Sequence, residues 1–298
     1  MKAGTNYAGP ILVLIAAVCW GCMGFFVRRL SALGFDPVQI TSARLSVAAL
    51  VFWALALLRG PGEAKIRLRD LPLFLALGLV SVLFFTVCYF SAISMLSLST
   101  AAILLYTSPI WVMLLSILFL GERFSRRKLL ALALAFGGCV LVSGLGGGAL
   151  SLRGLLLGLG SGIGYGLYSI FGTIALRRYS SYTVTAYTFL IAALGSFLIR
   201  SPAGTLAVLA ASPAPLSTLG FLIVTGLFTA VLPFLCYTLG LQRMEASRAA
   251  ILATVEPLVA TLLGVFLFSE TLSLSSALGI LLILAAVVLL NRRSPAAS

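Results

Sequence analysis

The sequence predicts an all-α membrane protein with ten transmembrane helices, arranged as two inverted five-helix repeats. Three observations support this fold class: the composition, the spacing of the apolar segments and an internal repeat. Of the 298 residues, 61% are hydrophobic and 9% are charged, and the mean hydropathy is +1.17. A soluble domain carries about 25% charged residues, so only a bilayer accommodates this much apolar surface. The composition therefore excludes a disordered chain, a coiled coil and a nucleic-acid-binding domain.

Ten apolar segments follow one another along the chain and are separated by short loops. A helix that spans a membrane needs about 20 predominantly apolar residues, and each segment comes close to that length. The segments cover residues 8–29, 37–58, 71–94, 100–120, 126–145, 154–176, 181–199, 216–241, 248–268 and 272–291. The first has no short apolar core followed by a small-residue cleavage site, so we expect a retained helix rather than a signal peptide.

The basic residues fall mainly on one side of these segments. With a cytoplasmic N-terminus, fifteen of the 20 Lys and Arg residues lie in inner segments and four lie in outer ones. This bias predicts a multi-pass protein of the cytoplasmic (inner) membrane with both termini in the cytoplasm. The net charge of +13 is spread between the apolar segments instead of clustering on one face, so we interpret it as a topology signal and expect no nucleic-acid partner.

The fourth and fifth segments recur as the ninth and tenth, at an offset of 148 residues. The stretch AAIL at 101–104 recurs at 249–252, and three scarcer residues, Pro109, Glu122 and Ser125, match Pro257, Glu270 and Ser273. Because five segments separate the copies, the second copy enters the membrane from the opposite side. We therefore expect two inverted halves, 1–148 and 149–298, an arrangement typical of secondary transporters.

Several stretches resemble the ten-helix, EamA-type branch of the drug/metabolite transporter superfamily. They are Trp20-Gly21 with Phe25, ARLSVAAL at 43–50, TSP at 107–109 with GE at 121–122, and VEPLVATLLGVFLFSETLS at 255–273. Ser269 departs from the family, which often has Gly before the Glu. By overall similarity the chain looks most like the YddG-type exporters of aromatic amino acids. The resemblance implies helices around a central cavity that opens to one side at a time, and transport directed outward.

Two charged side chains, Arg44 and Glu256, lie well inside apolar segments. A charge at the centre of a membrane helix costs about 2.5–3.5 kcal/mol on insertion scales, so each is expected to face a cavity or a partner. Arg44 would contact a substrate carboxylate, and Glu256 would contact an amino group or carry a proton. In the other interpretation, the two satisfy each other or nearby backbone carbonyls.

Pro109 and Pro257 occupy matched positions within helices, where a proline removes one internal hydrogen bond. We expect a pair of hinges, one in each half, although a static kink would give the same pattern. Gly162 and Gly166 form a small-x-x-x-small pair, which predicts close helix packing.

Six aromatic residues are candidates to line a cavity: four lie deep in the predicted helices, and two, Tyr89 and Tyr106, lie in the outer thirds of the third and fourth. A tyrosine hydroxyl inside a membrane needs a hydrogen-bond partner, which favours a cavity-facing position, although packing between helices is the alternative for each. A cavity of this kind suits planar, amphipathic solutes. The six are Trp20, Tyr89, Tyr106, Trp111, Tyr165 and Tyr168.

The residues absent from the chain narrow its function. There is no histidine and no P-loop, and the pair Cys19 and Cys22 has no further ligands to complete a metal site, so we expect no metal, no cofactor and no ATP-driven pump. Glu256 is the only deep carboxylate, which argues against a membrane-embedded enzyme. We expect a secondary transporter that exports aromatic or other hydrophobic amino acids. Drug-like cations, nucleosides or sugars are the alternative solutes. The oligomeric state stays open, a monomer included.

Overall fold

The computed structural model describes residues 7–144, 151–269 and 271–291. Helices account for all the regular structure in these ranges, and no strand occurs in them. The first half contains α1 (Ala8–Gly21), α2 (Met23–Ala32), α3 (Pro37–Arg59), a 3-10 turn (Leu68–Asp70), α4 (Leu71–Leu75), a π-helical segment (Ala76–Phe84), α5 (Phe85–Ile93), α6 (Leu98–Leu105), α7 (Ser108–Leu115), a second π-helical segment (Ser116–Leu120) and α8 (Arg126–Ser143). The second half contains α9 (Leu152–Leu176), α10 (Ser181–Ile199), α11 (Pro202–Ala211), α12 (Pro215–Gly226), a π-helical segment (Leu227–Val231), α13 (Leu232–Leu241), α14 (Ala246–Ala253), α15 (Val255–Phe268) and α16 (Leu274–Asn291).

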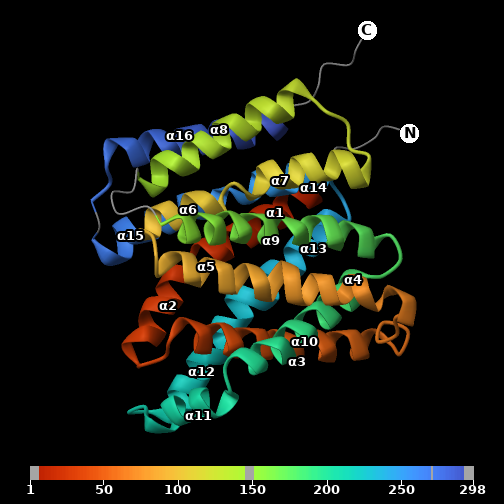
Figure 1. The fold of residues 1–298 in the computed structure, drawn as a ribbon, viewed down its shortest axis with the longest axis vertical. Coiled ribbons are helices and arrows are strands. Elements are labelled where there is room, and N and C mark those ends of the chain that lie inside the picture. Colours follow the sequence, from red (N-terminus) through yellow and green to blue (C-terminus); the bar gives the residue numbers. More distant parts are fainter. Residues whose placement is uncertain (1–6, 145–150, 270, 292–298) are drawn as a thin grey trace.

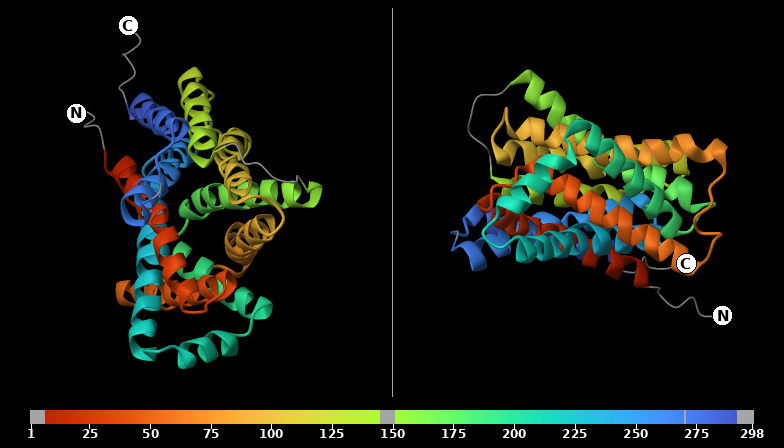
Figure 2. Two further views of the ribbon diagram at one scale, coloured as in Figure 1. Left: turned by 90° about the vertical axis from the view of Figure 1, so that its left-hand side faces the viewer. Right: turned by 90° about the horizontal axis from the view of Figure 1, so that it is seen from below.

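All ten predicted segments are helical. Within the described ranges, nine helical stretches are long and apolar enough to cross a membrane. The tenth segment is α8, which has 18 residues but begins with three basic ones, so its apolar part is shorter than the others. It packs along α16, and the two helices form one edge of the bundle (Figure 1, Figure 2). The fold is therefore that of a multi-pass membrane protein.

One helix lies outside the ten predicted segments. Helix α11 begins at Pro202, where the Ser201 hydroxyl accepts a hydrogen bond from the backbone N–H of Ala203. Its ten residues are too few to span a bilayer. Along the longest axis of the molecule, α11 lies on the side opposite α8 and α16 (Figure 1). Its residues Val208 and Leu209 pack against a buried cluster that includes Leu30.

The contacts between helices come in matched pairs, as two related halves require. Helix α1 packs against α13 and α15, and its counterpart α9 packs against α5, α6 and α7. Glycines at the same repeat position permit two further close contacts. A Cβ on Gly78 would lie 2.6 Å from Ile191 Cγ2, and a Cβ on Gly226, 148 residues later, would lie 2.6 Å from Val47 Cβ. Each half thus uses one glycine to bring its third helix against a helix of the other half.

The helices are interrupted at matched places near the middle of the bundle. Helix α6 gives way to α7 at Tyr106–Thr107, and α14 gives way to α15 at Thr254. The π-helical segments 76–84 and 227–231 also fall at equivalent positions of the two halves. The first predicted helix breaks at Cys22, a feature that the sequence did not predict. These interruptions place irregular backbone around the centre of the fold.

Candidate functional site

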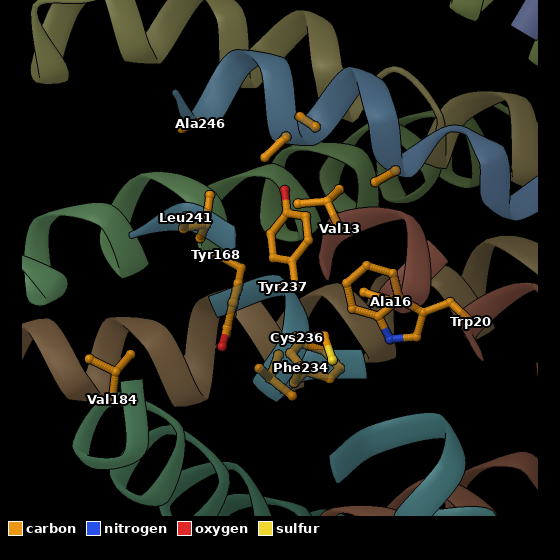
Figure 3. Packing of buried hydrophobic residues seen from close by; sticks show 14 of the residues in the cluster. Val13, Ala16, Trp20, Tyr168, Val184, Phe234, Cys236, Tyr237, Leu241 and Ala246 are labelled. Carbon is orange, nitrogen blue, oxygen red and sulfur yellow. The ribbon is translucent and has the colours of Figure 1, made fainter. Parts of the chain in front are cut away.

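An aromatic cluster occupies the middle of the bundle. The ring of Trp20, on α1, lies 5.1 Å from that of Phe234, 5.3 Å from that of Tyr237 and 6.0 Å from that of Tyr165, centroid to centroid. Tyr168 lies 5.1 Å from Phe234. Figure 3 shows Trp20, Tyr168, Phe234 and Tyr237 converging from three helices, α1, α9 and α13. The structure thus brings together Trp20, Tyr165 and Tyr168 from the predicted set.

Two tyrosine hydroxyls in this cluster have partners within the protein. Tyr168 Oη and Thr238 Oγ1 are 2.7 Å apart, and Tyr237 Oη and Ser169 Oγ are 2.8 Å apart. All four side chains are buried, so these bonds fasten α9 to α13 without leaving a buried polar group unsatisfied. Tyr165 differs, because it stays partly accessible and donates to a charged group.

The cluster borders a small central cavity. Its volume is about 20 Å³, which is room for about one water molecule. Residues of both halves line it: Trp20, Ser81, Ser108, Val112, Tyr165, Gly166, Tyr168, Ser169, Phe234, Tyr237, Ala250 and Ala253. The space that these residues enclose is therefore too small for an amino acid.

Glu256 lies beside this cavity, where α14 gives way to α15. It belongs to the first turn of α15, and the positive end of that helix dipole favours a carboxylate there. Tyr165 Oη donates to Glu256 Oε2 over 3.3 Å. A Cβ on Gly21 would lie 2.7 Å from the Glu256 carbonyl oxygen, so the glycine lets α1 approach this break. The Glu256 side chain keeps part of its surface accessible.

Glu256 also links several other predicted residues. It interacts electrostatically with Arg44 and with the hydroxyls of Tyr89 and Tyr106, which all lie in the first half of the chain. Arg44, Tyr89 and Tyr106 are each half-buried. The predicted charged residues thus lie within electrostatic range of each other, one in each half.

Arg44 is anchored by one residue of the second half. Its Nε donates to Thr229 Oγ1 over 2.7 Å, and its Nη2 donates to the Thr229 carbonyl oxygen over 2.9 Å. A partner in the backbone was one of the two alternatives that the sequence left open. In the structure this backbone partner is the Thr229 carbonyl, in the π-helical segment before α13. Arg44 also lies within electrostatic range of Glu256.

The matched break between α6 and α7 lies against α9. A Cβ on Gly162 would lie 2.6 Å from the Leu104 carbonyl oxygen, and a Cβ on Gly166 would lie 3.2 Å from that of Ser108. These short distances explain why α9 carries glycine at both positions. Pro109 is buried in the first turn of α7 and Pro257 in that of α15, where each follows the interruption of its helix.

Trp111 is set apart from the cavity. Its indole Nε1 donates to Thr107 Oγ1 on the same helical stretch over 3.2 Å, and Trp111 is not among the residues that line the 20 Å³ space. The cavity residues that sequence reasoning missed are Ser81, Ser108, Val112, Ser169, Phe234, Tyr237, Ala250 and Ala253. Ser108 could have been found, because it matches Glu256 at the 148-residue offset.

One end of the bundle is tied together by charged and polar contacts between the halves. We call it the basic end, and it carries Arg59, Lys128, Arg178 and Arg248. There Glu122 pairs with Lys128 at 3.0 Å and accepts hydrogen bonds from the N–H and hydroxyl of Ser247, at the start of α14. Asp70 pairs with Arg178 at 2.9 Å and accepts from the Tyr179 hydroxyl at 2.6 Å.

The opposite end is more open. It has an exposed ion pair of 2.7 Å between Asp36 and Arg200, and a hollow of about 500 Å³ between α2 and α12. The hollow is lined by Phe25, Arg29, Ala32, Leu33, Pro213, Ala214, Ser217, Thr218 and Phe221. The two ends of this conformation therefore differ in how firmly they are closed.

Comparison with known proteins agrees with this architecture. A solved crystal structure with 18% sequence identity has the same fold, with a TM-score of 0.80 over 96% of this chain and 97% of the other. An uncharacterized transporter of Archaeoglobus fulgidus is 32% identical over 284 residues, covering 94% of this chain and 95% of the relative. A probable terminal-alkyne amino-acid exporter of Streptantibioticus cattleyicolor is 24% identical over 95% of this chain and 93% of its own.

A third relative covers part of the chain. The pseudopaline exporter CntI of Pseudomonas aeruginosa is 28% identical over 192 residues, which are 63% of this chain and 64% of the relative.

The sequence model of the EamA-like transporter family matches twice, over residues 7–144 and 152–292. The two matches fall on the two copies of the internal repeat. The chain therefore belongs to the EamA-like transporter family, whose named relatives are transporters and not enzymes.

Proposed function

We propose that this protein exports small zwitterionic metabolites, above all aromatic or other hydrophobic amino acids, across the cytoplasmic membrane by alternating access. One observation carries the proposal. Two opposite charges, Arg44 from one half and Glu256 from the other, lie within electrostatic range of each other at the junction of the halves, and both residues are partly accessible. A zwitterion offers each of them a partner: its carboxylate suits the guanidinium, and its ammonium group suits the carboxylate.

The surroundings of the two charges favour an aromatic side chain on the substrate. The rings of Trp20 and Tyr165 lie side by side, and the ring centroid of Phe85 lies 5.2 Å from that of Tyr165. Aromatic rings pack on one another edge to face or offset, with a gain of about 0.5–1.5 kcal/mol beyond burial alone. The relative from Streptantibioticus cattleyicolor, a probable amino-acid exporter, supports the same class of substrate.

We place the basic end in the cytoplasm, on the positive-inside rule. In this conformation the polar contacts of Glu122 and Asp70 hold that end together, so the conformation corresponds to access from the outside or to a closed intermediate. Bending at Pro109 and Pro257 would open the basic end and close the other. Each proline lacks the N–H that would bridge the break, which keeps the two helix halves free to change angle.

The test is counterflow of labelled phenylalanine and tryptophan in proteoliposomes, with and without an imposed pH gradient. We expect saturable exchange that falls at least about tenfold when Arg44→Gln or Glu256→Gln removes one charge, since a charged hydrogen bond contributes about 1.5–3 kcal/mol. A flux that follows the pH gradient would make Glu256 the leading candidate for the proton site. Exchange of neither amino acid by well-folded protein would refute the proposed substrate and direct the search to cations, nucleosides and sugars.

A further inference from the structure

Pro233, the second residue of α13, changes the hydrogen bonding of Thr229 in the π-helical segment before it. In an α-helix the carbonyl oxygen of residue 229 accepts from the N–H of residue 233, but residue 233 is proline and has none. Directly before it, Leu232 N–H donates to Leu227 O, five residues back. The carbonyl of Thr229 therefore lacks the α-helical donor at position 233, at a point where the helix lies inside the membrane.

Arg44 supplies a donor to this carbonyl. The guanidinium uses its Nε and Nη2 for the hydroxyl and the carbonyl of Thr229, at 2.7 and 2.9 Å. Those two nitrogens form one of the flat edges with which an arginine binds two acceptors at once. Thr229 Oγ1 in turn donates to the Thr225 carbonyl over 2.6 Å, which fixes the rotamer of the threonine.

The other edge of the guanidinium remains for a ligand. An arginine has five N–H donors, and the hydrogen bonds of Arg44 within the described residues use two of them. The Nη1/Nη2 edge keeps donors for two acceptors at the spacing of a carboxylate. Arg44 is half-buried and lies within electrostatic range of Glu256 in the other half of the chain.

We propose that Thr229 and Pro233 are positioning residues: they hold one edge of Arg44 so that the other receives the carboxylate of the substrate. Pro233 leaves a backbone oxygen for the guanidinium, and Thr229 adds a second acceptor beside it. The close approach of α3 at Gly226, where a Cβ would lie 2.6 Å from Val47, brings Arg44 within reach of both. This inference rests on the proposed function, because it assigns Arg44 to the substrate.

The two acceptors of Thr229 that hold Arg44 determine specificity for carboxylates. A solute without a carboxylate does not bind the Nη1/Nη2 edge of Arg44. Weakening the attachment of Arg44 to Thr229 should therefore weaken binding of an amino acid and leave binding of the corresponding amine unaffected. Phenylalanine and 2-phenylethylamine are such a pair, since they differ by the carboxylate alone.

The experiment measures counterflow of labelled phenylalanine, and its inhibition by 2-phenylethylamine, in proteoliposomes of the full chain. Thr229→Val removes the hydroxyl at nearly constant volume, and Pro233→Ala adds an N–H that competes for the Thr229 carbonyl. We expect each to raise the half-saturating phenylalanine concentration about tenfold, the size of one lost charged hydrogen bond, with the inhibition constant of the amine within about twofold. Thr229→Ser retains the hydroxyl and should restore wild-type saturation.

Thr225→Val is the matched control, because it removes the hydroxyl one turn away, which donates to the Phe221 carbonyl. It should leave the saturation by phenylalanine unchanged. The inference is overturned if Thr229→Val saturates like the wild type while Arg44→Gln is impaired, or if Thr229→Val weakens the amine as much as the amino acid. A wild-type protein that moves no phenylalanine, or an Arg44→Gln variant that moves it normally, would instead refute the proposed function.

Discussion

Replacing Glu122 by Ala tests how much burial strengthens the contacts at the basic end. Lys128 lies 3.0 Å from two carboxylates, those of Glu122 and Glu245, but the side chain of Glu122 is 8% exposed and that of Glu245 is 45% exposed. Glu122 also accepts from the N–H and the hydroxyl of Ser247. Equal distances with unequal burial make the two residues a matched pair.

We expect Glu122→Ala to lower the free energy of unfolding by about 2–4 kcal/mol. Losing one partner of a fully buried ion pair costs about 3–5 kcal/mol, but Lys128 keeps Glu245, which lowers that part. The two donors of Ser247 lose their acceptor at about 1 kcal/mol each. Glu245→Ala should cost no more than about 1 kcal/mol, because an exposed ion pair is screened by water.

The assay is unfolding in mixed micelles titrated with SDS, followed by circular dichroism, on both variants and on their combinations with Lys128→Met. The coupling between residues 122 and 128 should exceed that between 245 and 128. Equal losses for Glu122→Ala and Glu245→Ala would refute the reasoning, since burial would then not decide the strength of these pairs.

Three further predictions concern the hinges, the deep carboxylate and the packing of α8. Pro257→Ala supplies an N–H to the Ala253 carbonyl across the break, so it should slow counterflow about tenfold while the circular dichroism and the elution volume stay unchanged; normal flux in folded protein would exclude a hinge. In Glu256→Gln, which has no titratable group at this position, any residual flux should ignore an imposed pH gradient, and a retained pH response would assign the proton to another residue. Gly138→Ala places a Cβ 2.7 Å from the Gly279 carbonyl oxygen and should cost about 1–3 kcal/mol, whereas Gly137→Ala, with its nearest neighbour at 3.9 Å, should be close to neutral in the same unfolding assay.

Hydropathy was sufficient to predict the ten helical segments, because each apolar run is bounded by charged or turn-forming residues. It could not predict α11, whose ten residues are too few for a spanning helix. The interruption before Pro257 was predictable, since a proline has no N–H to donate. The π-helical segment 76–84 was not, because its sequence ALGLVSVLF carries no residue that forbids an α-helix.

The site was predictable in part, for a reason specific to membranes. Charges are scarce in these helices, so Arg44 and Glu256 stood out, and both lie at the junction of the halves. Phe234 did not stand out, because every face of a membrane helix is apolar and the periodicity that identifies a buried face in soluble proteins is absent. Only the three-dimensional packing shows that α13 presents it to Trp20.

The size of the central cavity has a thermodynamic consequence. A space of about 20 Å³ admits a water molecule but no amino acid, so a conformation that holds the substrate in this space must differ from the one described here. Any antibody fragment that recognises this conformation must therefore compete with the substrate without touching its site. By linkage, the factor by which such a fragment weakens substrate binding equals the factor by which substrate weakens the fragment. That factor, measured from either side, gives the coupling free energy between the fragment and the substrate.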